Sequence, residues 1–194
     1  MSARIAPLAP PYEDAVSEAL SKWMPREAGV PPLALFRTIA LHPMLRERMH
    51  PLAAGLRGRG TLPLRVRELV ILRTCARCEA WYEWGVHATA FAAAAGIDHD
   101  ALRTITHATA AEIAARSDED ALVLQIADEL HDTSKLSERV FAAGVERFGA
   151  QSLLEIGALA GFYHLISFLI GIADVEPEPW AQPAPTHENA RASR

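Results

Sequence analysis

The sequence predicts an all-α protein. Apolar residues recur at intervals of three and four along nearly the whole chain, and no stretch shows the strict alternation of a half-buried strand. Prolines, glycines and short polar side chains divide this pattern into separate helices. Half of the 194 residues are apolar and 22% are charged, which suits one globular domain with a sizeable core.

Three helices are expected in the first 60 residues. Apolar residues from Tyr12 to Met24 mark the first helix, which should end near Pro25. Prolines begin and end the second helix, "PPLALFRTIALHP" at residues 31–43. The third helix stops in the glycine-rich "GLRGRG", and its apolar stripe consists of Leu45, Met49, Leu52 and Leu56.

The middle of the chain is expected to form two consecutive helices. Thr61 is placed to cap the first of them, and Pro63 suits its first turn. This helix should bend or restart around residues 78–80, and its continuation should end at Gly96.

The remaining helices are expected at about residues 98–105, 117–131, 137–148 and 152–172. Asp98 can cap the first of these, and Ser117 with Asp120 can form a capping box for the second. Gly149 should separate the last two helices.

The stretch from Ile156 to Ala173 carries no fixed charge and is long enough to reach the lower limit of a membrane span. It contains three glycines, a tyrosine and a histidine, and acidic residues lie just outside both of its ends. Without basic anchors or an aromatic belt, a helix buried in a bundle or at a subunit interface is expected instead.

We therefore expect one helical domain over residues 1–173, followed by a proline-rich tail over residues 174–194. The tail should be disordered or lie over a neighbouring subunit, and Trp180 is its one residue able to dock strongly. The formal net charge of −5 does not support nucleic-acid binding. The chain starts without a signal-peptide pattern, so a cytoplasmic protein without a membrane partner is expected.

The stretch "RELVILRTCARCEAWYEWGVHATAF" at residues 67–91 concentrates the groups that can carry chemistry. Glu83 and His87 are four residues apart, which places them on one helix face among aromatic residues. A buried carboxylate there should have a raised pKa, and a neighbouring histidine could hold or shuttle a proton. Glu68, Glu83 and His87 thus suggest a proton-relay site, although a pair at this spacing can also simply stabilise a wet helix surface.

Cys75 and Cys78 form a C-x-x-C motif, which can act as a redox dithiol where a thiol pKa is lowered at a helix N-terminus. Cys75 is expected inside a helix, so a reactive dithiol and two structural thiols both stay open. We expect no metal or other cofactor, because only His87 is nearby and the other histidines are scattered singly. The neighbouring arginines, which could draw an anionic substrate or form a solvated face, are Arg65, Arg67 and Arg73.

Several stretches resemble the carboxymuconolactone decarboxylase family, which includes the alkylhydroperoxidase D-like proteins. The stretches are "LFRTIALHP" at 35–43, "RELVILRT" at 67–74, "YEWGVHATAFAAAAGI" at 82–97 and "LLEIGALAGFYHLISFLIG" at 153–171. Together they cover most of residues 30–173, the expected core of the domain. The resemblance implies an alkylhydroperoxidase D-like helical fold that assembles into homo-oligomers, from dimers to hexamers, with sites near subunit contacts.

The peroxidase branch of this family has a glutamate, then a C-x-x-C at the start of the next helix, then a histidine four residues after the second cysteine. Glu68 and His87 match the ends of this pattern. The cysteines do not, because the matching positions are Ala80 and Glu83 and the actual pair lies five residues earlier.

The form "YEW-x-x-H" resembles members that lack the peroxidase cysteines and are named after the decarboxylase branch. It implies cofactor-independent acid/base chemistry on a small organic acid or lactone, with His87 as general acid/base and Glu83 and Glu68 as its partners. The alternative hypotheses are a thiol-dependent peroxidase or disulfide reductase that uses Cys75 and Cys78 on a peroxide, and a non-catalytic oligomeric scaffold. The pocket residues expected in the first case are Tyr82, Trp84, Tyr163 and His164.

Overall fold

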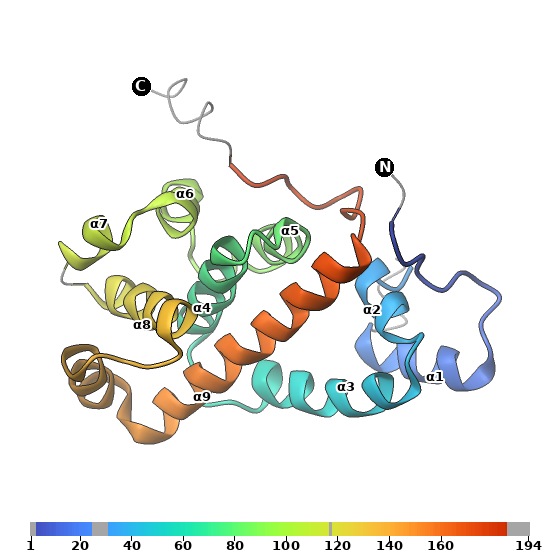
Figure 1. Cartoon of the computed structure of the whole chain (residues 1–194), viewed down its shortest axis with the longest axis horizontal. Helices are drawn as coiled ribbons and strands as arrows, with labels where there is room; N and C mark the ends of the chain where they lie inside the picture. Colours follow the sequence, from blue (N-terminus) through green and yellow to red (C-terminus); the bar gives the residue numbers. More distant parts are fainter. Residues whose placement is uncertain (1–2, 25–30, 117, 186–194) are drawn as a thin grey trace. The chain divides into compact units, whose positions relative to one another are not determined.

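The computed structural model describes residues 3–24, 31–116 and 118–185. Within these ranges the chain forms α-helices joined by turns and loops, with no β-strand, which confirms the all-α prediction (Figure 1). In chain order the helices are α1 (Asp14–Trp23), α2 (Ala34–Ile39), α3 (Pro43–Gly58), α4 (Leu64–Arg77), α5 (Trp81–Ala90), α6 (His99–His107), α7 (Ala110–Ala114), α8 (Glu119–Thr133) and α9 (Glu138–Ala173).

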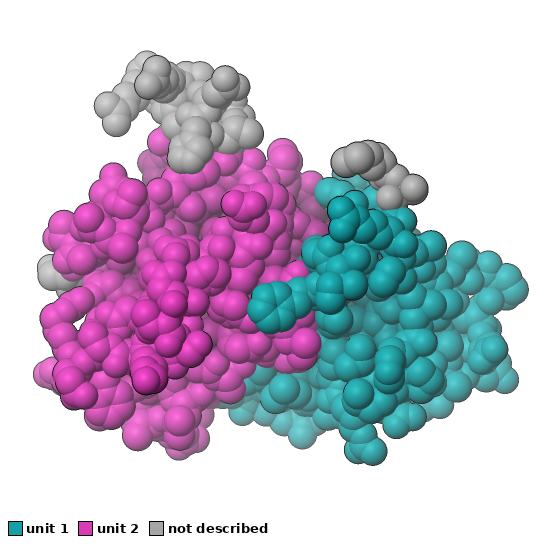
Figure 2. All heavy atoms as spheres, viewed as in Figure 1, with its two compact units in different colours: residues 1–60, 168–179 teal, residues 61–167, 180–194 magenta. Residues whose placement is uncertain are grey.

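Contacts between residues divide the chain into two compact units (Figure 2). The first unit comprises residues 1–60 and 168–179, and α1 contacts α2 and α3 within it. The second unit comprises residues 61–167 and 180–194, and α4 contacts α5, α6 and α8 there. The single domain expected over residues 1–173 stays a prediction.

α4 is the central helix of the second unit. Val66 and every residue from 68 to 76 are buried, so the helix has almost no solvent-facing side over this length. A helix enclosed in this way usually carries only apolar residues, because burying an unpaired polar group is costly. The buried Glu68, Arg73 and Thr74 are therefore the residues of α4 that need a specific explanation.

Three arginines of α4 each pair with an aspartate of α8 that lies 55 residues further along the chain. The constant separation means that the two helices run side by side in the same direction. The pairs are Arg65–Asp120, Arg73–Asp128 and Arg77–Asp132. Arg65 and Arg73 therefore hold two helices together. The expectation of a solvated face is wrong for Arg73, whose side chain is 2% exposed, whereas Arg65 stays partly exposed.

Two helix starts differ from the prediction. Thr61 does not cap α4, whose N-cap residue is Pro63. The backbone N–H and the hydroxyl of Thr61 instead both donate to Glu155 at 2.7 Å. The Thr61 side chain is therefore engaged in a tertiary contact with α9 and does not cap α4. The N-cap of α8 is Asp118, and Ser117 lies outside the described residues.

Several other boundaries agree with the prediction, whereas α5 ends at Ala90 and not at Gly96. Asp98 caps α6 through its side chain, and Gly149 interrupts α9 with a φ of 76°. α4 and α5 are separate helices, and Glu79 between them has a left-handed φ of 53°, which turns the chain sharply. The short α7, which begins with a capping box of Thr109 and Glu112, was not foreseen.

By length and composition α9 could cross a membrane, a test that the core helix of a soluble protein also passes. Half of its most apolar window is buried within the chain. Beyond α9, the backbone N–H of Gln182 donates to Thr89 on α5 at 2.8 Å. This part of the predicted tail thus lies along α5 of its own chain, while residues 186–194 lie outside the described residues.

Candidate functional site

His87 is the centre of a buried hydrogen-bonded group in the second unit. Its Nδ1 lies 2.6 Å from Oε2 of Glu68. Its Nε2 lies 3.0 Å from the hydroxyl of Tyr163 and 3.4 Å from Oε1 of Glu83. All four residues are less than a tenth exposed. The structure thus brings together the three residues predicted as the relay and one predicted pocket residue, while their catalytic role stays a prediction.

Three helices supply this group. Glu83 and His87 lie on the same face of α5 because a separation of four residues is close to one helical turn. Glu68 reaches His87 from the buried length of α4, and Tyr163 reaches it from α9. The second carboxylate oxygen of Glu68 accepts from Nε of Arg67 at 3.1 Å, so both of its oxygens are engaged. Arg67 therefore belongs to the edge of this group.

The two ends of the Glu68–His87 contact have opposite pKa shifts. Burial favours the neutral forms, but hydrogen bonds to Glu68 and Glu83 outweigh it at His87 and raise the pKa of the imidazole above 6.5. At Glu68 burial is again outweighed, by His87 and Arg67, and the pKa falls below 4.5. At Glu68 pairing therefore dominates over desolvation. The arrangement favours a carboxylate beside an imidazolium.

Glu83 contributes an unusual carboxylate oxygen. Its Oε2 is buried and finds no hydrogen-bond partner among the described residues. Leaving a buried acceptor unsatisfied costs about 1–3 kcal/mol, and more for a charged group. Such groups are rare in native proteins and often mark a functional site. Glu83 Oε2 is therefore available to accept a proton or a hydrogen bond from a reacting group.

Cys75 lies inside α4, as expected, and its side chain is fully buried. Burial raises the pKa of its thiol well above 9.0, and the negative charge of Glu83 acts in the same direction, followed by smaller effects of Cys78 and Glu68. The thiol is thus protonated at neutral pH and lies within electrostatic reach of the relay carboxylates. It could react as a nucleophile only with the help of a base.

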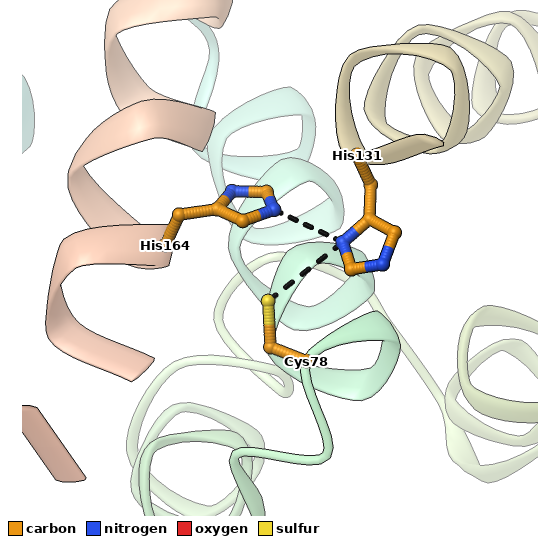
Figure 3. Close-up of side chains that lie close together, drawn as sticks. All are labelled: Cys78, His131 and His164. Carbon is orange, nitrogen blue, oxygen red and sulfur yellow. Dashed lines mark hydrogen bonds between the residues drawn. The ribbon is translucent and has the colours of Figure 1, made fainter. Parts of the chain in front are cut away.

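Cys78 faces a different set of groups (Figure 3). It is the C-cap residue of α4 and is half-buried. Its Sγ lies 3.8 Å from Nδ1 of His131, which in turn lies 3.0 Å from Nε2 of His164. His131 was not among the predicted site residues, and His164 was expected in the substrate pocket. The interpretation of the histidines as scattered is wrong at these two positions, because the fold brings both to Cys78.

The other predicted pocket residues, Tyr82 and Trp84, are buried to 3% and 1% exposure. The indole N–H of Trp84 has no hydrogen-bond partner among the described residues. A cavity of about 510 Å³ in the same unit has an apolar lining from α8 and α9, including Ile126 and Leu153, and none of the relay residues lines it. The pocket expected around Tyr82 and Trp84 stays a prediction.

Comparison with known proteins places the fold. No protein-family model matches the sequence, and no curated protein matches it either. Among solved structures, the chain is similar to an uncharacterized peroxidase-related protein from Silicibacter sp. TM1040, with a TM-score of 0.74 and 14% identity over 91% of this chain and 93% of the other. It is also similar to a cysteine-to-alanine variant of the debrominase Bmp8 in complex with 2,3,4-tribromopyrrole, with a TM-score of 0.72 and 12% identity over 93% and 94% of the two chains.

These likenesses extend over nearly the full length of all three chains. They confirm the predicted alkylhydroperoxidase D-like helical fold. At this level of identity they establish the fold alone, because one fold can carry several chemistries. The predicted assembly into homo-oligomers stays a prediction.

Proposed function

We propose that the chain is a thiol-dependent enzyme that reduces a small peroxide, with Cys75 as the nucleophile. Glu83, His87 and Glu68 would act as its proton relay. The observation that carries this proposal is the proximity of a fully buried thiol to a buried acid/base group, since Glu83 is the charge with the largest effect on Cys75 and also contacts His87. The likeness to a peroxidase-related protein and a debrominase supports a redox reaction over lactone decarboxylation.

The proposed reaction begins with transfer of the Cys75 thiol proton to Glu83, whose Oε2 has no hydrogen-bond partner among the described residues. The thiolate attacks one peroxide oxygen, so that a sulfur–oxygen bond forms and the O–O bond breaks. The departing oxygen takes a proton from Nε2 of His87, and the proton on Glu83 replaces it. The raised pKa of His87 favours the protonated ring that donates this proton.

The second half-reaction uses Cys78. Its thiol attacks the sulfenic acid on Cys75, a disulfide forms, and the hydroxyl group leaves as water. The two residues are one helical turn apart, which is within the usual Cα separation for a disulfide. An external dithiol then reduces the disulfide and completes the cycle.

Acid/base chemistry on a small organic acid or lactone, without thiols, is the second candidate. The complete burial of Cys75 favours it, because a peroxide must reach that sulfur. The same Glu68–His87 pair would then act directly on the substrate. A non-catalytic scaffold is the third candidate. It predicts that substitutions at Glu83 and His87 abolish oligomerisation, while no enzymatic activity is found that they could reduce.

The test is peroxide consumption driven by dithiothreitol, in the presence of a metal chelator. The wild type should exceed the reagent background, Cys75→Ser should fall to that background, and His87→Gln should lose about 10²–10⁴-fold in rate. The control is His99→Gln, which removes an exposed histidine and should change nothing. A full rate in Cys75→Ser would overturn the proposal. The proposal would also be overturned if the wild type showed no rate above the background and both of its thiols stayed reduced. That outcome would direct the search to lactone substrates.

A further inference from the structure

We propose that Cys78, His131 and His164 form a binding site for a zinc-class divalent metal ion, with three protein ligands and one open position. Their donor atoms all lie within 4.8 Å of one another, and all three side chains are half-buried (Figure 3). One sulfur and two imidazole nitrogens are donor types that zinc prefers. Three protein ligands with an open fourth position are typical of reactive zinc sites, whereas structural sites are closed by four.

Two of the three distances between the donor atoms are close to those around a tetrahedral ion, and the third pair lies within 4.8 Å. Bonds of about 2.3 Å to sulfur and about 2.0–2.1 Å to nitrogen separate tetrahedral ligands by about 3.6 Å for a sulfur–nitrogen pair and about 3.3 Å for two nitrogens. The Sγ of Cys78 lies 3.8 Å from Nδ1 of His131, and the two imidazole nitrogens lie 3.0 Å apart. Adjustments of a few tenths of an ångström would bring both pairs to the coordination distances.

The imidazole of His164 is already oriented for this role. Its Nδ1 lies 2.8 Å from the carbonyl oxygen of Ala160, which can only accept a hydrogen bond. In the neutral ring Nδ1 therefore carries the proton, and the lone pair of Nε2 points at His131. A metal-bound histidine almost always donates its other N–H in this way to a carbonyl or carboxylate oxygen.

The electrostatic surroundings of Cys78, His131 and His164 favour a bound cation. Cys78 is the C-cap of α4 and His131 lies in the last turn of α8, so the partially negative ends of two helix dipoles face the cluster. Arg77 is the cation with the largest effect on His131, and it pairs with Asp132 at 2.5 Å and with Asp128 at 3.5 Å. Its charge is thereby largely compensated.

Binding would release the thiol proton of Cys78. Burial raises the pKa of Cys78, partly offset by Ser167 and Arg77, so the thiol is protonated until an ion displaces its proton. His131 shares its Nδ1 with both partners, and an ion bound there would shift the single proton of the neutral ring from Nδ1 to Nε2. Burial, aided by Arg77 and His164, lowers the pKa of His131, which keeps the ring neutral and able to coordinate.

This site goes beyond the proposed peroxide reaction and constrains it. A metal ion on Cys78 holds its sulfur as a thiolate ligand, so metal binding and the Cys75–Cys78 disulfide exclude each other. The loaded form would keep Cys78 reduced, and oxidation of the pair would release the ion. The metal site can nevertheless be measured without any peroxide present.

The test is titration of reduced, tag-free protein with Co²⁺, followed by the absorption bands of thiolate-to-cobalt charge transfer and of tetrahedral cobalt. We expect saturation at one equivalent in the wild type. The matched controls are Cys75→Ala, which removes the other thiol, and His99→Gln, which removes an exposed histidine; both should keep the bands. Cys78→Ser should lose the charge-transfer band. His131→Gln and His164→Gln should each weaken cobalt binding by more than about 100-fold. Loss of a residue that only hydrogen-bonds to a metal ligand typically costs about 10–100-fold, so the larger effect identifies a direct ligand.

A charge-transfer band that persists in Cys78→Ser would overturn the assignment, and so would a wild type that shows only the spectrum of free aqueous cobalt. If Cys78→Ser fails to fold by circular dichroism, Zn²⁺ protection of Cys78 against alkylation in the wild type decides instead. Unchanged labelling with Zn²⁺ present would then contradict the site. The peroxide assay contains a chelator and the cobalt titration contains no peroxide, so each proposal can fail without the other.

Discussion

Cys75 and Cys78 are three residues apart at the end of one helix, yet they lie among different partners. Cys75 is fully buried beside the carboxylates that surround His87, whereas half-buried Cys78 contacts His131. One turn of helix therefore separates a thiol that faces an acid/base group from a thiol that faces a potential metal-binding pair. This difference should be visible in how the two sulfurs react.

Alkylation of the native protein should label Cys78 at least about tenfold faster than Cys75. The thiolate is the reacting species, and each unit by which burial raises a thiol pKa lowers its population tenfold. Burial raises the pKa of Cys78 too, but Ser167 and Arg77 partly offset this, and its side chain is accessible. Mass spectrometry after timed labelling measures both rates, with unfolded protein as the reference in which the two thiols should react alike. Equal rates in the native protein would contradict the burial of Cys75.

Arg73→Met should destabilise the fold by about 3–5 kcal/mol, because the buried Asp128 loses its bidentate partner and keeps only Arg77, at 3.5 Å. The Arg73 side chain is only 2% exposed, and its guanidinium donates to both oxygens of Asp128 at 2.7 and 2.8 Å. It also donates to the carbonyl oxygens of Ile105 and Ala108, so several acceptors lose their partner at once. Urea unfolding followed by circular dichroism measures the change in the free energy of unfolding.

The control for Arg73 is Arg116→Met, which breaks an ion pair whose two side chains are 39% and 48% exposed. Exposed pairs contribute about 0–1 kcal/mol, so this variant should remain close to the wild type. If Arg73→Met and Arg116→Met lowered the free energy of unfolding by a similar small amount, the Arg73–Asp128 pair would not be needed for stability.

The Glu68–His87 pair should stabilise the fold most between about pH 4.5 and 6.5. The folded-state pKa of His87 is raised, so its contribution is complete below 6.5 and is lost as the pH rises through the raised value. The folded-state pKa of Glu68 is lowered, so its contribution is complete above 4.5 and is lost as the pH falls through the lowered value. The measurement is the free energy of unfolding against pH for the wild type and His87→Gln.

The difference between these two proteins should be largest inside that window and shrink on both sides. His99→Gln, which changes an exposed histidine, should follow the wild type at every pH. A difference that does not vary with pH would mean that His87 stabilises the fold through packing and not through its charge.

The helical fold and the grouping of Glu83 and His87 with Glu68 could be predicted because both depend on local spacing. The helical period of apolar residues follows directly from burial of one helix face. Glu83 and His87 are one turn apart, and Glu68 lies nineteen residues before His87 on the preceding helix. The pKa direction of Glu68 could not be predicted, because it depends on how closely His87 and Arg67 approach.

The cluster at Cys78 could not be found in this way, because 53 residues separate Cys78 from His131 and another 33 separate His131 from His164. A signal for the helix pairing was nevertheless present in the sequence. Arginines at 65, 73 and 77 and aspartates at 120, 128 and 132 have identical intervals, as two parallel helices with paired charges require. That register places the end of α4 beside the end of α8, where Cys78 and His131 meet.

Gly85→Ala should detach the segment at Gln182 from α5. A Cβ at this position would lie 2.6 Å from the backbone oxygen of Gln182, a separation that forces one of the two to move. α5 itself should tolerate alanine, which is about 1 kcal/mol more favourable than glycine inside a helix. The segment is held by a hydrogen bond from Gln182 to Thr89 and should be the part that moves. We therefore expect faster amide exchange at Gln182 and earlier proteolytic cleavage near residue 182, with the helical content unchanged.

The matched control is Gly157→Ala, because a Cβ at Gly157 meets nothing within 4 Å. It should raise stability by up to about 1 kcal/mol and leave exchange at Gln182 as in the wild type. Since α5 also carries Glu83 and His87, the pair of variants shows whether the segment affects the relay. A peroxide rate that changes in Gly85→Ala but not in Gly157→Ala would mean that this segment controls access to the buried site. Identical exchange at Gln182 in both variants would mean that it does not rest on α5 in solution.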